Sequence, residues 1–317
     1  MKVRTPNFSS PPELATGALS GGLVLDSKQE SSMDIKDILV QIDSSNGNEA
    51  RLNLAIELAR RHGANLIGLC VFDIGLLPSA GFRIFDPEDC LTILQFQEQL
   101  RDDGLAIAAK LEEDFNERLR REAIRGEWRL VEGEAVTTVG LHARYVDLAV
   151  LGQQDPDDTR VSGWTTVLEV ALLTSGRPIL VVPYAGNLSD VGRRVLIGWD
   201  GGREAARAVH DALPLLSKAE VVTVLAIDPR YGNDDYGNEP GADISRHLAR
   251  HGVPVTAKKT SSEGLDAADI LLNYASDLGC DLIVIGGYGH SRMREIVLGG
   301  VTRGLLQHAT VPVLMSH

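Results

Sequence analysis

Glycines that can approach a phosphate group follow an apolar run in the last third of the chain. They stand at Gly286 and Gly289 and, after nine further residues, at Gly299 and Gly300. A glycine at a strand end allows a sharp turn, and a second one lets backbone amides approach a ligand without an intervening side chain. The last two glycines precede a helix expected over residues 301–308, whose unpaired N–H groups and positive dipole end favour an anion. The spacing therefore predicts a phosphate-binding loop.

An acidic residue, Asp200, follows another apolar run of the same half, Val195–Trp199. Open parallel sheets bind ligands outside the carboxyl ends of their strands, where the strand order reverses. With a strand order of 3-2-1-4-5, Asp200 and Gly286 face one another across that crevice. A carboxylate there suits a ribose hydroxyl or a base amino group. The alternative is that Asp200 only accepts backbone amides in its own Asp-Gly-Gly turn, and the sequence leaves both roles open.

The elements that must position these residues alternate short apolar runs with amphipathic helical patterns. Continuous apolar strands separated by helices indicate an α/β fold in which both faces of a parallel sheet are covered. A long charged helix is expected over residues 88–123. The expected strands are residues 38–42, 66–72, 128–131, 148–151, 179–182, 195–199, 221–227, 253–257, 282–285 and 313–315.

The same order of elements occurs twice along the chain. Asp147-Leu-Ala-Val-Leu-Gly152 matches Asp281-Leu-Ile-Val-Ile-Gly286, and Pro178 matches Pro312 at the same offset. A duplication predicts two open-twisted parallel five-stranded sheets of order 3-2-1-4-5, each with helices on both faces. We expect the first domain at residues 35–186 and the second at residues 187–317, paired within the chain. Residues 1–34, rich in Ser, Pro and Gly, are expected to be a disordered extension.

The matching loop of the first half has lost the glycine pattern. It reads Gly152-Gln-Gln-Asp155, with an acid at the position of Gly289. Two threonines, Thr165 and Thr166, replace the last two glycines. Because a carboxylate repels a phosphate and side chains crowd it, we expect the first half to bind no phosphate through this loop.

This pattern resembles that of the ATP-binding members of the universal stress protein family, and the resemblance covers residues 35–317. The family has Gly, two residues, Gly, nine residues, Gly, and then a small residue that is usually Ser or Thr. The resemblance implies a tandem protein of the stress response that binds ATP or a related adenine nucleotide in its second half, with Mg²⁺ on the phosphates. It places Asp200 and Ala226 on the nucleoside, and it places Gly286, Gly289, Gly299, Gly300 and Val301 on the ribose and phosphates.

Gly300 departs from the family pattern. It keeps the backbone donor of the Ser/Thr position and loses the hydroxyl. A lost hydrogen bond to a charged group is worth roughly 1.5–3 kcal/mol, which weakens affinity by about tenfold to a hundredfold. The alternative interpretation is a nucleotide-free scaffold that recruits a protein partner, with the glycines serving only turns. Gly300 and Asp155 favour the scaffold, whereas the intact spacing favours ATP.

The composition excludes other classes of function. A net charge of −13 and a pI of about 5.1 oppose binding to nucleic acid or to an anionic membrane. No apolar run approaches the roughly 18 residues of a membrane span, and no secretory leader is evident, so the expected location is the cytoplasm. The three cysteines form no CxxC pair, and no histidine spacing predicts a metal site.

The sequence offers little for catalysis. It contains no Walker A motif, no GxSxG motif and no legible nucleophile–base pair. We therefore expect a binding protein and not a dedicated enzyme, with slow ATP hydrolysis left open. The sequence also leaves open whether two chains form a homodimer, because pairing of the two halves within one chain could satisfy the same contact.

Overall fold

The computed structural model describes residues 34–72, 87–158, 164–185, 188, 191–229, 239–288 and 300–317. Apart from Asp34, the predicted disordered extension lies outside these residues, and so does the predicted boundary at residues 186–187. The described part of the chain contains ten strands and eight helices.

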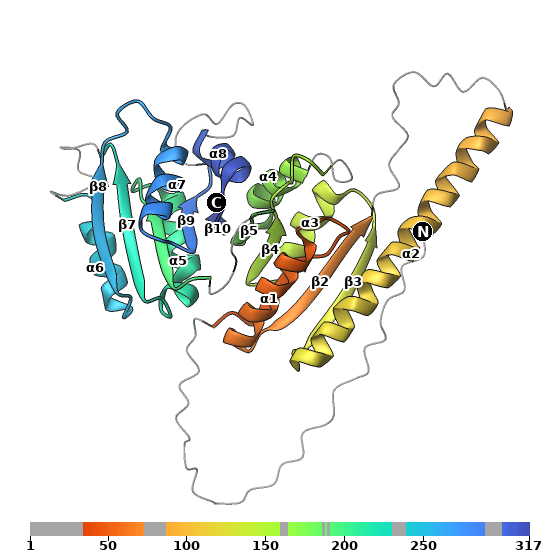
Figure 1. Ribbon diagram of the computed structural model, residues 1–317, viewed down its shortest axis with the longest axis horizontal. Coiled ribbons are helices and arrows are strands. Elements are labelled where there is room, and N and C mark those ends of the chain that lie inside the picture. Colours follow the sequence, from red (N-terminus) through yellow and green to blue (C-terminus); the bar gives the residue numbers. More distant parts are fainter. Residues whose placement is uncertain are drawn as a thin grey trace, which may run out of the picture. The chain divides into compact units, whose positions relative to one another are not determined.

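Strands and helices alternate through the first half (Figure 1), and every strand predicted there is present. Its helices α3 and α4 were not predicted individually. The elements are β1 (Asp37–Gln41), α1 (Asn48–His62), β2 (Asn65–Phe72), α2 (Pro87–Glu122), β3 (Gly126–Glu132), α3 (Ala135–Ala143), β4 (Leu148–Gly152), α4 (Trp164–Ser175) and β5 (Ile179–Val182).

The second half repeats this order. Its third strand begins later than predicted because Pro254 has no N–H group; only its carbonyl pairs, accepting a hydrogen bond from Val222 N at 2.9 Å. The elements are β6 (Arg194–Gly198), α5 (Arg203–Leu216), β7 (Val221–Ile227), α6 (Ala242–Arg250), β8 (Val255–Thr260), α7 (Ala267–Asp277), β9 (Leu282–Gly286), α8 (Gly300–His308) and β10 (Val313–Ser316).

All ten strands belong to one sheet with the order β3-β2-β1-β4-β5-β10-β9-β6-β7-β8. Each half has the predicted order 3-2-1-4-5, but the two sheets join edge to edge through an antiparallel β5–β10 pair. Leu180 pairs with Leu314, which is its own counterpart in the repeat. The repeat is therefore related by a pseudo-twofold axis that passes between these two leucines.

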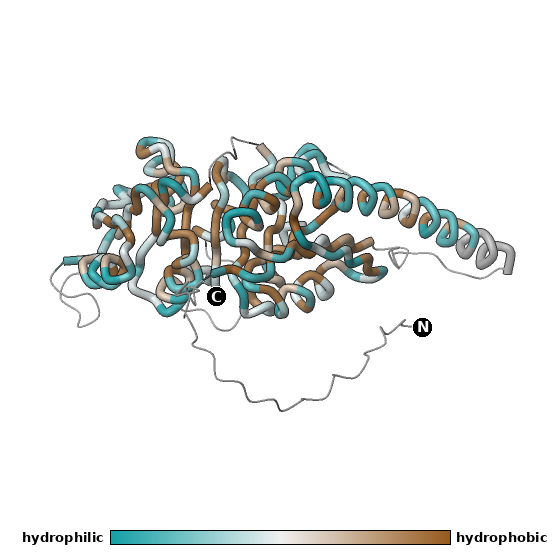
Figure 2. Tube along the Cα trace, turned by 90° about the horizontal axis from the view of Figure 1, so that it is seen from below, coloured by the Kyte–Doolittle hydropathy of each residue, from teal (hydrophilic) through white to brown (hydrophobic). Residues whose placement is uncertain are grey.

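Two layers of helices cover the two faces of the sheet. One hydrophobic core lies under α1, α2, α5 and α6, and the other lies under α3, α4, α7 and α8. Neighbouring residues of a strand face opposite cores: Val40 belongs to the first core and Leu39 to the second. Figure 2 shows the resulting concentration of hydrophobic residues along the strands. Burial on both faces explains why the strands read as continuous apolar runs.

The aspartate that begins each copy of the repeated motif holds neighbouring strands together. Asp147 Oδ2 accepts a hydrogen bond from Asp37 N at 3.0 Å, beside the start of β1. Asp281 accepts hydrogen bonds from Gly192 N at 2.7 Å and from Arg194 N at 3.0 Å, beside the start of β6. These aspartates lie at the amino ends of the strands, so their recurrence reflects the fold and not a ligand.

Two of the three thiols, Cys70 and Cys280, are buried and free, and burial raises the pKa of each to about 11. The side chain of Cys90 is outside the described residues. Among the described helices, none combines the length and the apolar character that a membrane span requires.

Candidate functional site at the carboxyl ends of the strands

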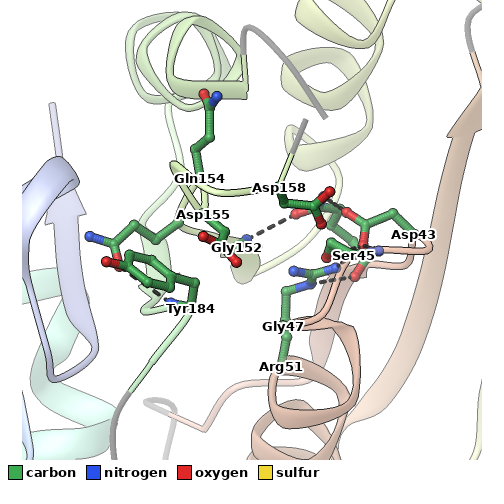
Figure 3. A pocket seen from close by; sticks show the side chains of 11 residues that line it. Asp43, Ser45, Gly47, Arg51, Gly152, Gln154, Asp155, Asp158 and Tyr184 are labelled. Atoms are coloured by element: carbon green, nitrogen blue, oxygen red, sulfur yellow. Dashed lines mark hydrogen bonds and ion pairs between the residues drawn. The ribbon is translucent and has the colours of Figure 1, made fainter. Parts of the chain in front are cut away.

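A hollow lies at the carboxyl ends of β1 and β4 in the first half (Figure 3). Its walls come from the end of β1, the turn that follows, the first turn of α1 and the loop after β4. Its volume is about 330 Å³, including the solvent at its open mouth. It occupies the place in this half where the fold predicts a ligand.

Arg51 of helix α1 extends into this hollow, and its side chain is only 3% exposed. Its Nε donates to the Gln41 carbonyl at 2.7 Å, and Nη2 pairs with Asp43 Oδ1 at 2.9 Å. A β-carbon on Gly152 would lie 2.2 Å from Arg51 Nη1. A side chain at position 152 would therefore have to displace the guanidinium.

Two polar side chains beside Arg51, those of Gln41 and Asp43, also pair internally. Gln41 Oε1 accepts a hydrogen bond from Gly152 N at 2.9 Å, and Gln41 Nε2 donates to Asp43. Asp43 Oδ1 also accepts from Ser45 N at 2.9 Å, in the turn after β1. Asp43 therefore stabilises the turn after β1 and also pairs with the buried guanidinium of Arg51.

The amino end of α4 is capped by the loop after β4. Gln154 Oε1 accepts hydrogen bonds from Thr165 N at 3.1 Å and from Thr165 Oγ1 at 3.2 Å. The carboxylate of Asp155 bends back within the loop and accepts from Asp157 N at 3.0 Å. A protein oxygen from Gln154 therefore occupies the helix terminus that a phosphate would use.

Neither Arg51 nor Gln154 was predicted from the sequence to be a site residue. Arg51 stands beside the apolar residues of α1 in the sequence. An arginine at such a position usually extends its charged group into solvent, so its burial was not predicted. Gln154 gave no signal, because its partner Thr165 is eleven residues away along a loop. The sequence predicted repulsion by Asp155, and in the structure the carboxylates of Asp155 and Asp158 line this hollow together with the Arg51–Asp43 ion pair.

In the second half, the predicted residues gather at the corresponding edge. Strand β6 lies between β7 and β9, and all three run parallel. Asp200, which follows β6, and Gly286, the last residue of β9, therefore lie at the same carboxyl edge, as predicted. Ala226 is the next-to-last residue of β7, at that same edge, and is 3% exposed.

Two of these residues also have structural roles. Asp200 Oδ1 accepts a hydrogen bond from Gly202 N at 2.8 Å, which is the turn role that the sequence left open. A β-carbon on Gly286 would lie 2.4 Å from Ala205 N and 2.9 Å from Glu204 Cβ. The first turn of α5 thus packs directly on the end of β9, and this contact alone requires a glycine at position 286.

Carboxylates are prominent at this edge. Glu204 is 8% exposed; burial acts to raise its pKa, but the hydrogen bond from Arg203 and the charge of that side chain lower it overall. Asp266 caps α7 by accepting from Ala268 N at 2.9 Å. Its other oxygen lies 3.4 Å from the position that a β-carbon on Gly300 would take. A phosphate beside Gly300 would therefore need a compensating cation.

The rest of the predicted loop is only partly described. Gly289 and Gly299 lie outside the described residues. Gly300 is the first described residue of α8 and is exposed. Val301 follows in the first turn and packs at the edge of the core under α8.

The repeated strand order and these two edges define a class of protein: a tandem of open α/β domains, each with a candidate site at the carboxyl ends of its first and fourth strands. Residues 192–317 match the model of the universal stress protein family. Universal stress protein YxiE of Bacillus subtilis is 27% identical over 143 residues, and the match covers 38% of this chain and 97% of that relative. Universal stress protein Slr1230 of Synechocystis is 38% identical over 48 residues, but the match covers 15% of this chain and only 17% of that relative.

A solved structure of similar length supports the fold of both halves. The universal stress protein from Archaeoglobus fulgidus aligns with a TM-score of 0.66 at 15% identity, covering 90% of this chain and 97% of that one. Residues 192–317 thus match the universal stress protein family, and the first half repeats the same fold.

Proposed function

We propose that the second half binds ATP or a related adenine nucleotide and that the chain acts in a stress response by binding, without rapid turnover. The observation that carries this proposal is the contrast between the two edges. In the first half, Arg51 and Gln154 occupy the crevice and the helix terminus. In the second half, α8 begins at Gly300, and the glycine spacing of the family is intact.

The proposed contacts follow from the strand order. A carboxylate has several acceptor sites, so Asp200 can accept from a ribose hydroxyl as well as from Gly202 N. The backbone near Ala226 suits an adenine ring, because main-chain groups at a strand end can pair with ring nitrogens. The ribose and phosphates would lie on Gly286, Gly289, Gly299, Gly300 and Val301.

The carboxylates at this edge fit Mg²⁺ together with the phosphates. Mg²⁺ binds through oxygen ligands, usually one or two carboxylates plus substrate phosphates and waters. Asp266 lies beside the amino end of α8, where the phosphates would lie. When bound, Mg²⁺ would neutralise phosphate charge that Asp266 and Glu204 otherwise repel.

Calorimetric titration of the full chain with ATP and Mg²⁺ tests this function. We expect one binding site, lost in a Gly289→Asp variant, because a carboxylate would then project into the phosphate loop. The matched variant, Asp155→Ala, changes the corresponding loop of the first half and should leave binding unchanged. No binding at millimolar ATP by protein with a native circular dichroism spectrum would reject the nucleotide function.

Removal of the Asp266 charge should change how ATP affinity depends on metal. In an Asp266→Asn variant the amide oxygen would still accept the capping hydrogen bond from Ala268 N, so α7 keeps its cap. We expect this variant to bind ATP about tenfold more tightly than the native chain in EDTA and to gain less from added Mg²⁺. If the substitution changes the affinity for ATP equally with and without Mg²⁺, Asp266 does not lie near the phosphates.

A scaffold function is the second candidate, and the long helix α2 favours it. Apolar side chains on this helix are exposed: Phe96 by 52% and Ile107 by 51%. A protein partner could bury them. If the ATP titration fails, this candidate becomes the leading one.

A further inference from the structure

The first two residues of the glycine loop after β9 pack against the first half of the chain. Gly287 and Tyr288 follow β9, whereas their neighbour Leu172 lies on α4. The two sides of this contact therefore come from different halves of the repeat. The half that has lost the glycine loop thus touches the loop of the half that is proposed to bind nucleotide.

Gly287 is a glycine because α4 lies against it. A β-carbon at this position would lie 2.6 Å from Leu172 Cδ2, and the three nearest atoms all belong to the Leu172 side chain. Its φ lies outside the left-handed region, so the backbone itself would accept alanine. Its N–H donates to the Ser316 carbonyl of β10 at 2.8 Å. Leu172 therefore presses directly on a fixed point of the loop.

Tyr288 has an unusual conformation for an aromatic residue. Its φ is +62°, in the left-handed region that bulky residues rarely adopt. Its hydroxyl is buried and has no hydrogen-bond partner among the described residues. The ring packs edge-on to His317, with centroids 5.8 Å apart, and His317 Nδ1 lies 3.1 Å from the Gly287 carbonyl. Such a conformation persists only where surrounding groups hold it.

Charges from both halves surround this tyrosine. Burial, followed by the carboxylate of Glu169 on α4, raises the pKa of Tyr288 to about 12, while Arg303 on α8 acts in the opposite direction. Burial also raises the pKa of Glu169, and Arg303 again opposes the shift. The phenol therefore stays neutral at physiological pH.

Glu169 and Arg303 are counterparts in the repeat, with the same offset as Leu180 and Leu314 on the pseudo-twofold axis. In a symmetric pair of identical domains, each of these side chains would meet its own copy. Here an acid faces a base across the axis, beside the loop. The two halves have thus become complementary at the point where α4 meets the glycine loop.

We propose that helix α4 of the first half positions the glycine loop of the second half, with Leu172 against Gly287 and Glu169 near Tyr288. The first half would then act as a built-in positioning partner for a nucleotide site that it does not itself contain. This inference rests on the proposed nucleotide function for its consequence, but the loop contact can be tested without nucleotide.

A double-mutant cycle across the contact tests the proposal. Gly287→Ala adds a methyl group that collides with Leu172, so it should displace the loop and weaken ATP binding by about tenfold. Leu172→Ala removes the colliding atoms, and the Gly287→Ala/Leu172→Ala double variant should return to within about threefold of the Leu172→Ala single variant. Leu58→Ala, another buried leucine in a helix of the first half, controls for lost stability and should leave affinity unchanged.

Amide hydrogen exchange of the peptide covering residues 282–288 is measured on the same variants without ligand. We expect faster exchange in Gly287→Ala and recovery in the double variant. If the native chain binds no ATP but exchange follows this pattern, the nucleotide function fails and the positioning contact stands. If Gly287→Ala leaves both exchange and affinity unchanged, or if Leu172→Ala gives no rescue, α4 does not position the loop.

Discussion

Replacing Asp43 with alanine is expected to lower the free energy of unfolding by about 3–5 kcal/mol, because it removes the carboxylate that pairs with the buried Arg51 guanidinium. The neutral acceptors that remain are the Gln41 carbonyl at 2.7 Å and Asn48 Oδ1 at 3.2 Å. Neither compensates for the desolvated charge. Urea unfolding at pH 7, followed by circular dichroism, measures the change.

Removal of both charges should lower the free energy of unfolding much less. An Asp43→Asn/Arg51→Met double variant leaves no unpaired ion and keeps a side chain of similar length in the hollow. For comparison, Glu122 pairs with Arg60 on the surface, where the two side chains are 27% and 50% exposed. Glu122→Ala should therefore cost less than about 1 kcal/mol. If Asp43→Ala lowers the free energy of unfolding no more than Glu122→Ala does, the buried Arg51 is not stabilised by its ion pair with Asp43.

Acidification should destabilise the chain through His62, a buried histidine where α1 meets the second half. His62 is 7% exposed, and Lys218 Nζ lies 3.2 Å from its Nδ1. Lys218 also donates to the Arg61 carbonyl at 3.1 Å, and Arg61 Nη1 donates to the Val191 carbonyl at 2.7 Å. His62 thus lies among cations at the contact between α1 and the end of α5.

Burial, followed by the charge of Lys218, lowers the pKa of His62 from 6.5 to about 4; Arg61 adds to this shift and Asp34 opposes it. Between these pH values the unfolded chain binds a proton that the folded chain does not, so stability is lost as the pH falls from about 6.5 to about 4. The shift corresponds to a loss of about 3 kcal/mol.

Unfolding curves at pH 7, 6, 5 and 4 should separate this contribution from that of the carboxylates, which titrate in part of the same range. A His62→Gln variant stays uncharged throughout and should lose about 3 kcal/mol less than the native chain over this interval. His210 has a side chain that is 77% exposed, and His210→Gln should follow the native curve. Parallel curves for the native and His62→Gln chains would show that the pKa of His62 is the same in the folded and unfolded states.

Much of the fold was predictable because its signals are local. A strand such as β4 is an unbroken apolar run, and its recurrence as β9 in the second half predicted two similar domains with the same strand order. The glycine spacing and the acid after β6 follow from this order, because parallel neighbours end at one edge. These features can be predicted from the repeat of the sequence pattern and from the fixed handedness of the connections between parallel strands.

The contacts that distinguish the two halves depend on tertiary structure. Nothing near Gly152 in sequence indicates that Arg51, from the first helix of the domain, fills the adjoining space. The antiparallel pairing of β5 with β10, and Leu172 against Gly287, likewise join segments that are far apart in the chain. A sequence pattern shows which face of an element is apolar, but only packing decides which side chain reaches a given point. The sequence alone therefore predicted two domains of which only the second keeps the glycine loop, and the structure showed which of the chain's own side chains line the crevice of the first.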